Sequence, residues 1–375
     1  MQFNRAGAVP LPEAASAVEE HTRPVALQGT TAYLMTPEAL LIVDTRTGRR
    51  LAAIRPQHPP QPAFHGVGQM VAAAPVITEV QGKTQALATF VVIVPGHGTT
   101  PEHRAVELVA VDTTTRTLAW RMTLPLSDDS SARQLSQVVG VQGTTAIVNV
   151  APPANVSTPG TVHAVDLSTR TLRWTHENAH ALALAGNQVV GVAPNRGRRQ
   201  LTAWAVQDGR TRWRTMTITS REMQAQAAGS SLLAISGIDY ETADPFFALV
   251  DPATGAQLDR RTGDGATAYC LFDQVEVLVC SRETLTKTRQ VFAIDATTGK
   301  RLWQLPAHGQ LAPRVTAVWH GAVYTTTDYN GSTVLDARTG KDRNARPGAS
   351  PVIVNGVVGI VETQYGQLTA YPTSG

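Results

Sequence analysis

Short apolar runs separated by turn residues recur along the chain in groups of four. In the first group, "RPVALQGT" (23–30), "AYLM" (32–35) and "LLIV" (40–43) lead to an aspartate, Asp44, and a fourth stretch follows it. Runs of this length, bounded by Gly, Asp, Asn and Pro, are typical of β-strands, and no window has a convincing helical period. The pattern therefore predicts repeated units of four short strands.

The aspartate that ends the third run of each unit allows the units to be counted. It occurs at Asp44, Asp112, Asp166, Asp251, Asp295 and Asp336, and two further copies carry Ala205 and Pro372 in its place. Successive anchors are 68, 54, 39, 46, 44, 41 and 36 residues apart. A period in the forties is typical of solenoid or propeller units. Eight anchors predict eight units.

Each anchor begins a turn with recognisable chemistry. The Asp side chain can accept hydrogen bonds from N–H groups two or three residues on, and a Gly three or four residues later takes a positive φ without steric cost. Eight residues after the anchor, four units carry a tryptophan: Trp120, Trp174, Trp213 and Trp303. Such a ring can wedge between neighbouring sheets and bury about 150–250 Å². Three other units have Ala52, Asp259 or Asn344 there, so we expect those seams to be packed less tightly or differently.

Four-stranded units of this length cannot bury both faces alone, but a closed ring of them can. We therefore predict an all-β fold, an eight-bladed β-propeller of four-stranded antiparallel blades in a single domain over residues 1–375. The blades are expected at roughly 23–55, 71–124, 136–177, 179–216, 223–263, 266–306, 311–346 and 349–375. The last unit has only three strands, so we expect residues 2–9 to complete it and close the ring. The chain would then be a complete domain.

The phrase "AIDATTGKRLW" at 293–303, read as apolar–Asp–x–x–Thr–Gly–x–x–x–Trp, resembles the pyrroloquinoline-quinone (PQQ)-like repeat. The similarity covers nearly the whole chain and implies an eight-bladed propeller. The family includes quinoprotein dehydrogenases with PQQ and calcium on the axis, the propeller lipoprotein of outer-membrane protein assembly, and propeller domains attached to bacterial membrane proteins and kinases.

The dehydrogenase branch of that family has features that this sequence lacks. Its adjacent cysteine pair has no counterpart, because Cys270 and Cys280 are ten residues apart, and no C-x-x-C-H haem site occurs. The resemblance thus implies the scaffold without the chemistry, and we expect no cofactor, with PQQ and calcium as the alternative. The two cysteines form either a disulfide in an oxidising compartment or two buried free thiols.

Composition limits the classes of partner and the cellular compartments that we expect for the protein. Charged residues make up 16% of the chain, and 30 glycines and 23 prolines suit short strands with many turns. The net charge of +3 is too small an excess to predict a nucleic-acid partner. No run of 18 apolar residues predicts a membrane span, and the first residues do not resemble a signal peptide. We expect the soluble part of a longer exported or membrane-anchored bacterial protein, extracellular or in the cell envelope; a cytoplasmic protein is the alternative.

Loop lengths indicate a binding face. The turns after the first and third strands of each unit are short, whereas the connections after the second and fourth are long and share the opposite face. On that face we select as candidate contact residues His65, His97, His103, Arg133, Arg196, Arg198, Asp239 and Tyr240. The arginines could meet an acidic partner or phosphate, and the acidic loop that contains Asp239 and Tyr240 could meet a protein or a cation. For each of them the alternative is a solvated loop, and no metal site is predicted.

The sequence contains no G-x-S-x-G, H-E-x-x-H or P-loop motif. We therefore predict a non-catalytic binding or assembly scaffold with a protein partner. The alternatives are a PQQ- and calcium-dependent dehydrogenase-like enzyme and a domain that senses a small-molecule ligand for an attached membrane protein or kinase.

Overall fold

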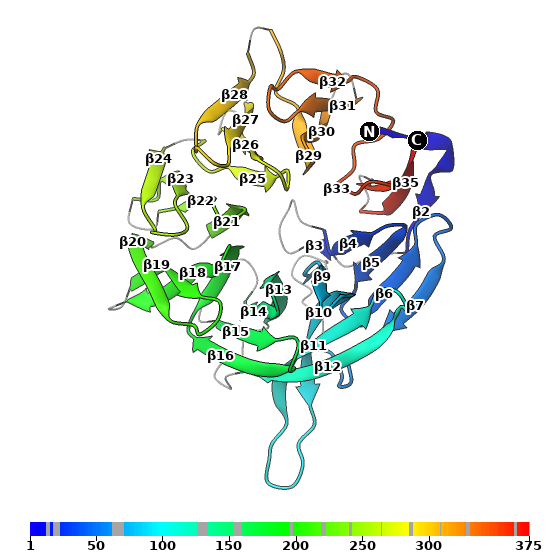
Figure 1. The fold of residues 1–375 in the computed structure, drawn as a ribbon, viewed down its shortest axis with the longest axis vertical. Coiled ribbons are helices and arrows are strands. Elements are labelled where there is room, and N and C mark those ends of the chain that lie inside the picture. Colours follow the sequence, from blue (N-terminus) through cyan, green and yellow to red (C-terminus); the bar gives the residue numbers. More distant parts are fainter. Residues whose placement is uncertain are drawn as a thin grey trace.

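The structure, a computed structural model, describes residues 1–12, 16–17, 23–61, 71–126, 134–152, 160–195, 198–218, 223–239, 242–263, 265–284, 288–307, 309–327, 331–363 and 366–374. In this part of the chain the only helix is a short 3₁₀ turn, η1 (Arg5–Gly7). Eight antiparallel sheets stand around a central axis, so the predicted eight-bladed β-propeller is confirmed (Figure 1).

The strands of each blade follow one another in chain order from the axis outwards, and we number the blades 1 to 8 along the chain. The innermost strands are β4 (Val25–Gln28), β9 (Val76–Val80), β13 (Leu135–Gln142), β17 (His180–Ala185), β21 (Met223–Ala228), β25 (Tyr269–Phe272), β29 (Arg314–Trp319) and β33 (Ile353–Val354). The second strands are β5 (Thr31–Met35), β10 (Lys83–Val94), β14 (Thr145–Ala151), β18 (Gln188–Asn195), β22 (Leu232–Ile238), β26 (Val277–Glu283), β30 (Ala322–Thr327) and β34 (Val358–Glu362).

The third strands are β6 (Leu40–Asp44), β11 (His103–Asp112), β15 (Thr161–Asp166), β19 (Arg198–Ala205), β23 (Pro245–Val250), β27 (Arg289–Asp295), β31 (Gly331–Asp336) and β35 (Leu368–Ser374). The outer strands of blades 1 to 7 are β7 (Arg50–Ile54), β12 (Thr117–Pro125), β16 (Thr171–Glu177), β20 (Thr211–Ile218), β24 (Gln257–Thr262), β28 (Arg301–Leu305) and β32 (Asp342–Asn344). A separate parallel pair joins β3 (Ser16–Ala17) to β8 (Val71–Ala72).

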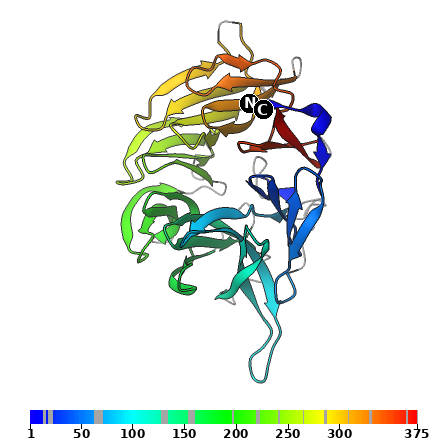
Figure 2. The ribbon, with the colours of Figure 1, turned by 45° about the vertical axis from the view of Figure 1, so that its right-hand side comes forward.

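The N-terminal segment closes the ring, as predicted. Strands β1 (Gln2–Phe3) and β2 (Val9–Pro10) both pair antiparallel with β35, with Gln2 opposite Ser374. The two ends of the chain consequently lie side by side (Figures 1 and 2). Phe3 is buried, and its ring centroid lies 5.8 Å from that of Tyr324 in blade 7. The last blade therefore has no exposed edge where it meets the start of the chain.

The carboxylates of the anchor aspartates accept hydrogen bonds from backbone N–H groups in the turns that they begin. Asp112 accepts from the N–H groups of Thr114 and Thr115 at 2.8 and 2.9 Å, and Asp295 accepts in the same way from the two residues at equivalent positions. These bonds favour the ionised carboxylate, and the pKa of Asp112 is lowered chiefly by the Thr115 N–H. The anchors thus stabilise turns.

Three tryptophans join neighbouring blades in one common geometry. Their Nε1–H donates to the carbonyl that directly follows the next blade's anchor position, from Trp174 to Val206 at 2.9 Å, from Trp213 to Pro252 at 2.8 Å and from Trp303 to Ala337 at 2.8 Å. Each ring also lies against the glycine of that turn, so that a Cβ added there would come within 2.9 Å of it at Gly209, 2.6 Å at Gly255 and 2.7 Å at Gly340. The turn glycine therefore has two functions, a positive φ and room for the ring.

The fourth tryptophan differs because its neighbouring turn differs. Blade 3 carries Arg170, with φ of 59°, at the positive-φ position that is glycine in the three turns above; blade 2 has Arg116 there in the same way. Trp120 instead donates within its own blade, to Gln85 Oε1 at 3.2 Å, and is buried there. The seam between blades 5 and 6 differs as well: blade 5 carries Asp259 in the tryptophan position, and a Cβ on Gly299 would meet nothing nearer than 3.9 Å.

Candidate functional site

A cavity of about 260 Å³ lies where the innermost strands of blades 2 to 6 surround the axis. It is lined by Ala73, Ala74, Pro75, Val76, Gln137, Val138, Val139, Leu182, Gln224, Ala225, Gln226, Ala234, Ser236, Ala268, Tyr269 and Cys270. These lining residues are all uncharged, and the polar groups among them are amides and hydroxyls. The cavity is smaller than the pockets of about 300–1,000 Å³ that hold drug-sized molecules, so its size and chemistry suit water or a small neutral molecule.

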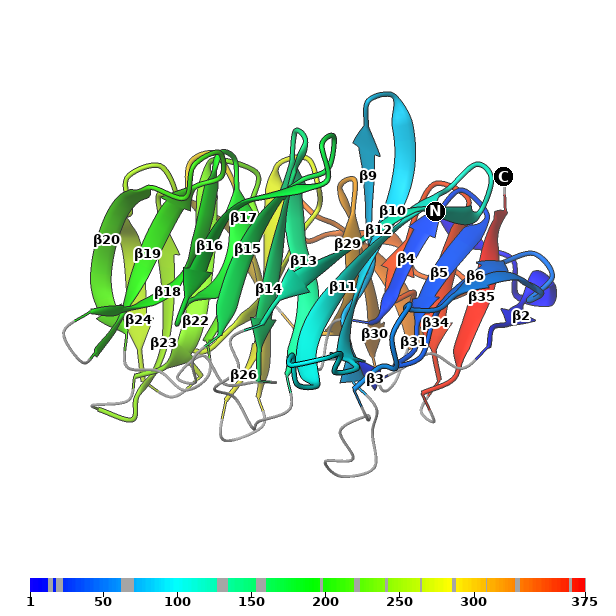
Figure 3. The same cartoon turned by 90° about the horizontal axis from the view of Figure 1, so that it is seen from below.

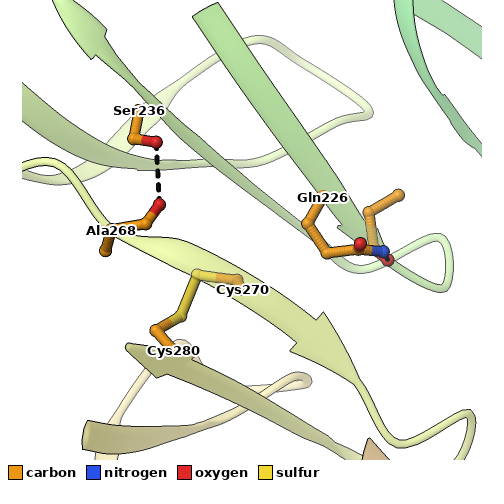
Figure 4. Close-up of a disulfide and its surroundings, with 6 residues drawn as sticks. Gln226, Ser236, Ala268, Cys270 and Cys280 are labelled. Atoms are coloured by element: carbon orange, nitrogen blue, oxygen red, sulfur yellow. Dashed lines mark hydrogen bonds between the residues drawn. A yellow bond between two sulfur atoms is a disulfide. The ribbon is translucent and has the colours of Figure 1, made fainter. Parts of the chain in front are cut away.

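The wall of this cavity is held by a hydrogen bond between blades 5 and 6 and by a disulfide within blade 6 (Figure 4). Ser236 Oγ donates to the Ala268 carbonyl at 2.7 Å, which joins the second strand of blade 5 to the segment before β25. Cys270 and Cys280 face each other on β25 and β26 and are joined by a disulfide. Of the two alternatives for the cysteines, the structure has the cross-link, and Cys270 contributes it to the cavity wall.

The loop residues selected from the sequence do not gather in one place. His97 and His103 belong to the β10–β11 hairpin, which projects outward from the ring (Figure 1). His97 is exposed in a turn closed by two backbone bonds with Thr100, at 2.9 and 3.0 Å. Asp239 follows β22 in blade 5, where its carboxylate lies 3.5 Å from Arg260. The histidines and the aspartate thus stand on different blades.

The side chains of the remaining selected residues are not among those that the structure describes. His65, Arg133, Arg196 and Tyr240 lie outside the described residues, and Arg198 is described only as the first backbone position of β19. Within the described ranges, no group of three His, Cys, Asp or Glu side chains could hold a metal ion. In the same ranges, no helix has the length and hydrophobicity to cross a bilayer.

The strands place the two kinds of connection on opposite faces of the ring. In the side view the strands run from one face of the ring to the other (Figure 3). The turns after the first strand span two residues in several blades, at 29–30, 81–82, 143–144 and 186–187, whereas those after the second strand span 95–102 and 152–160 in blades 2 and 3. Since consecutive strands are antiparallel, the longer connections share one face with those between blades.

Sequence reasoning missed the axial lining and a group of arginines between blades 5 and 6. The lining comes in short stretches of one to four residues from separate blades, and no spacing along the chain connects Gln137, Gln224 and Tyr269. A signal for the arginines was present, since Asp259 replaces the tryptophan that fills other seams.

Four-stranded units closed by an Asp turn and joined by a Trp–Gly contact define the chain as a propeller of the PQQ-like repeat class. The family model described as "Outer membrane protein assembly factor BamB" matches residues 104–277 and 287–374, and the chain belongs to this family.

Two solved structures show the same fold at low sequence identity. The computationally designed protein Ika8 is 15% identical over 99% of this chain and 100% of its own, with a TM-score of 0.60. BamB from Moraxella catarrhalis is 12% identical over 99% of both chains, with a TM-score of 0.52. A europium-containing methanol dehydrogenase is 12% identical over 98% of this chain and 85% of its own, with a TM-score of 0.48. No curated protein is significantly similar to this sequence.

Proposed function

We propose that this chain is a non-catalytic binding scaffold of the bacterial cell envelope that holds a protein partner on the face of its long connections. The observation that carries the proposal is the asymmetry of the ring, with two-residue turns after the first strands of blades 1 to 4 and 7, and connections such as 95–102 and 152–160 on the other face. Loops on a rigid scaffold are where binding residues concentrate. His97, His103 and Asp239 are the described candidates on this face, together with His65, Arg133, Arg196, Arg198 and Tyr240.

Two further observations support the proposal. The family is described by an outer-membrane protein assembly factor, which fits a scaffold in the envelope. The Cys270–Cys280 disulfide fits an oxidising compartment such as the periplasm.

The neutral lining of the axial cavity supports a function without PQQ or calcium. Calcium takes six to eight oxygen ligands, most often including carboxylates, and PQQ itself carries three carboxylates that need positively charged or donor-rich partners. Among the described residues, those that line the cavity include no Asp, Glu, Arg or Lys. We accordingly propose that no quinone chemistry takes place on the axis.

Site-specific photo-crosslinking tests which face binds. A photo-reactive residue is placed at His97 or Thr242, in long connections, or at Asn187 or Gln142, at short turns, and bacterial envelope extract is added. We expect one and the same protein to be cross-linked from both long connections and from neither short turn. Adducts formed only from the short turns would contradict the proposal, as would dye reduction by the purified protein after addition of PQQ and calcium.

A further inference from the structure

Three arginines meet in the seam between blades 5 and 6, and we call Arg261, Arg282 and Arg301 the arginine seam. Arg282 and Arg301 place their guanidinium carbons 5.7 and 4.8 Å from the centre of the Phe292 ring. Arg261 reaches the same place from the other blade, because it stands opposite Phe247, whose ring meets that of Phe292 edge-on at 5.8 Å. Two blades thus contribute cations around one pair of aromatic rings.

The space for these side chains exists because a tryptophan is missing. In the seams that begin with Trp174, Trp213 and Trp303, the indole covers the next blade's turn. In blade 5 the same position is Asp259, which stands opposite Leu249 in the register of β23 and β24. The long guanidinium side chains therefore cover the outer part of this seam, where these three seams are closed by a ring.

Positive charge is in excess in this seam. Asp259 lies 3.5 Å from Arg261, whereas Arg282 donates twice to the neutral Gln290 Oε1, at 2.9 and 2.6 Å, and Arg301 donates to Gln304 Oε1. Among the described residues, no carboxylate forms an ion pair with Arg282 or Arg301. Burial lowers the pKa of both guanidinium groups, and neighbouring arginines lower it further, while the charge of Asp259 partly offsets this lowering at Arg301. An anion would relieve this repulsion.

The spread of the arginines indicates the shape of the anion. Arg282 pairs with Gln290 and Arg301 with Ile294, four residues apart on β27, so their backbones differ by about 13 Å along the strands and by two strand spacings across them. The three guanidinium groups come from three strands, β24, β26 and β28, on two blades. An extended peptide presents alternate side chains on one side about 7 Å apart, which can place one carboxylate on each fork.

We propose that the arginine seam binds an extended acidic segment of a partner protein, with Asp or Glu carboxylates on the guanidinium groups of Arg261, Arg282 and Arg301. The inference rests on the proposed function as a protein-binding scaffold and adds the chemistry of the partner. Arginine is suited to this task because its planar fork binds a carboxylate through two parallel hydrogen bonds.

The test uses a fluorescein-labelled peptide of four Glu-Ser repeats and follows its anisotropy with the full chain at low salt. We expect saturable binding that weakens as salt is raised, and no binding of the matched Gln-Ser peptide. The double variant Arg282→Gln/Arg301→Gln should weaken the dissociation constant at least tenfold. The control Arg49→Gln/Arg50→Gln removes the same charge from exposed positions of blade 1 and should change it less than twofold.

A variant that binds more tightly separates an effect on binding from a loss of the folded structure, because an unfolded variant would bind more weakly. Asp259→Asn removes the carboxylate that competes for Arg261, so the Glu-Ser peptide should bind two- to threefold more tightly. Equal affinity in both double variants would overturn the inference, and so would displacement of the peptide by inorganic phosphate at concentrations at which chloride has no effect. If Arg282→Gln/Arg301→Gln still cross-links the partner through His97 but no variant binds the peptide, the inference fails and the proposed function stands.

Discussion

Gly255→Ala is expected to lower the free energy of unfolding by about 3 kcal/mol, whereas Gly299→Ala should lower it by about 1 kcal/mol. The two glycines occupy the same turn position with nearly the same backbone, at φ of 74° and 69°. An alanine therefore meets the same left-handed conformation at both. Only at Gly255 does the new methyl group meet a ring, 2.6 Å from Trp213, while Gly299 has no atom closer than 3.9 Å.

Urea unfolding followed by circular dichroism measures both losses. The matched control is the same pair of substitutions in a Trp213→Ala background, where Gly255→Ala should cost no more than Gly299→Ala, because the clash has been removed. Equal costs of the two glycine substitutions in the wild-type background would show that the Trp213 ring does not lie against this turn.

Lowering the pH from 7 to 5 is expected to lower the free energy of unfolding by about 2 kcal/mol for each of two buried histidines, His163 and His180. Burial lowers the pKa of His163 to about 4, and a hydrogen bond to the Pro125 backbone carbonyl only partly offsets it. Burial, aided by the charge of Arg199, also lowers the pKa of His180 to about 4. Between the ordinary histidine pKa of about 6.5 and pH 4, the unfolded chain binds these protons and the folded chain does not, so stability falls as the pH falls.

Urea midpoints at pH 7, 6 and 5 test this dependence. The range stops at pH 5 because the pKa of Asp112 and Asp295 is lowered from an ordinary 3.8, so their contribution is lost only in more acidic solution. His163→Gln should remove about half of the dependence, whereas His97→Gln on the exposed hairpin should leave it unchanged. A stability that does not vary from pH 7 to 5 would contradict the burial of both rings.

The parts of the fold that were predictable from sequence are those with local causes. The turn at Asp112 is made by bonds that span three residues, and the contacts of Trp174, Trp213 and Trp303 follow from a fixed offset within the repeat. Trp120 obeys the same offset but not the same contact, because its partner turn, more than forty residues further on, carries Arg170. A repeat predicts which residue one blade contributes to a seam, but not the residue of the next blade that it contacts.

The candidate sites were less predictable for the same reason. The axial cavity collects residues such as Gln137, Leu182 and Tyr269 from different blades, and no local pattern distinguishes them from other inward positions. The arginine seam depends on how β24 of blade 5 packs against the strands of blade 6. Its only local signal is Asp259, which shows that a ring is missing but not which side chains take the space.

The assignment of the two faces depends on a ring closed by β1 against β35, and one cross-linking measurement tests this closure. Gln2 and Ser374 are direct partners in the register, so the variant Gln2→Cys/Ser374→Cys should form a second disulfide on mild oxidation, identified by mass spectrometry of the linked peptides. Gln2→Cys alone should keep its thiol free. If residues 2 and 374 remain unlinked while Cys270 and Cys280 are bonded, the closed ring described above is wrong.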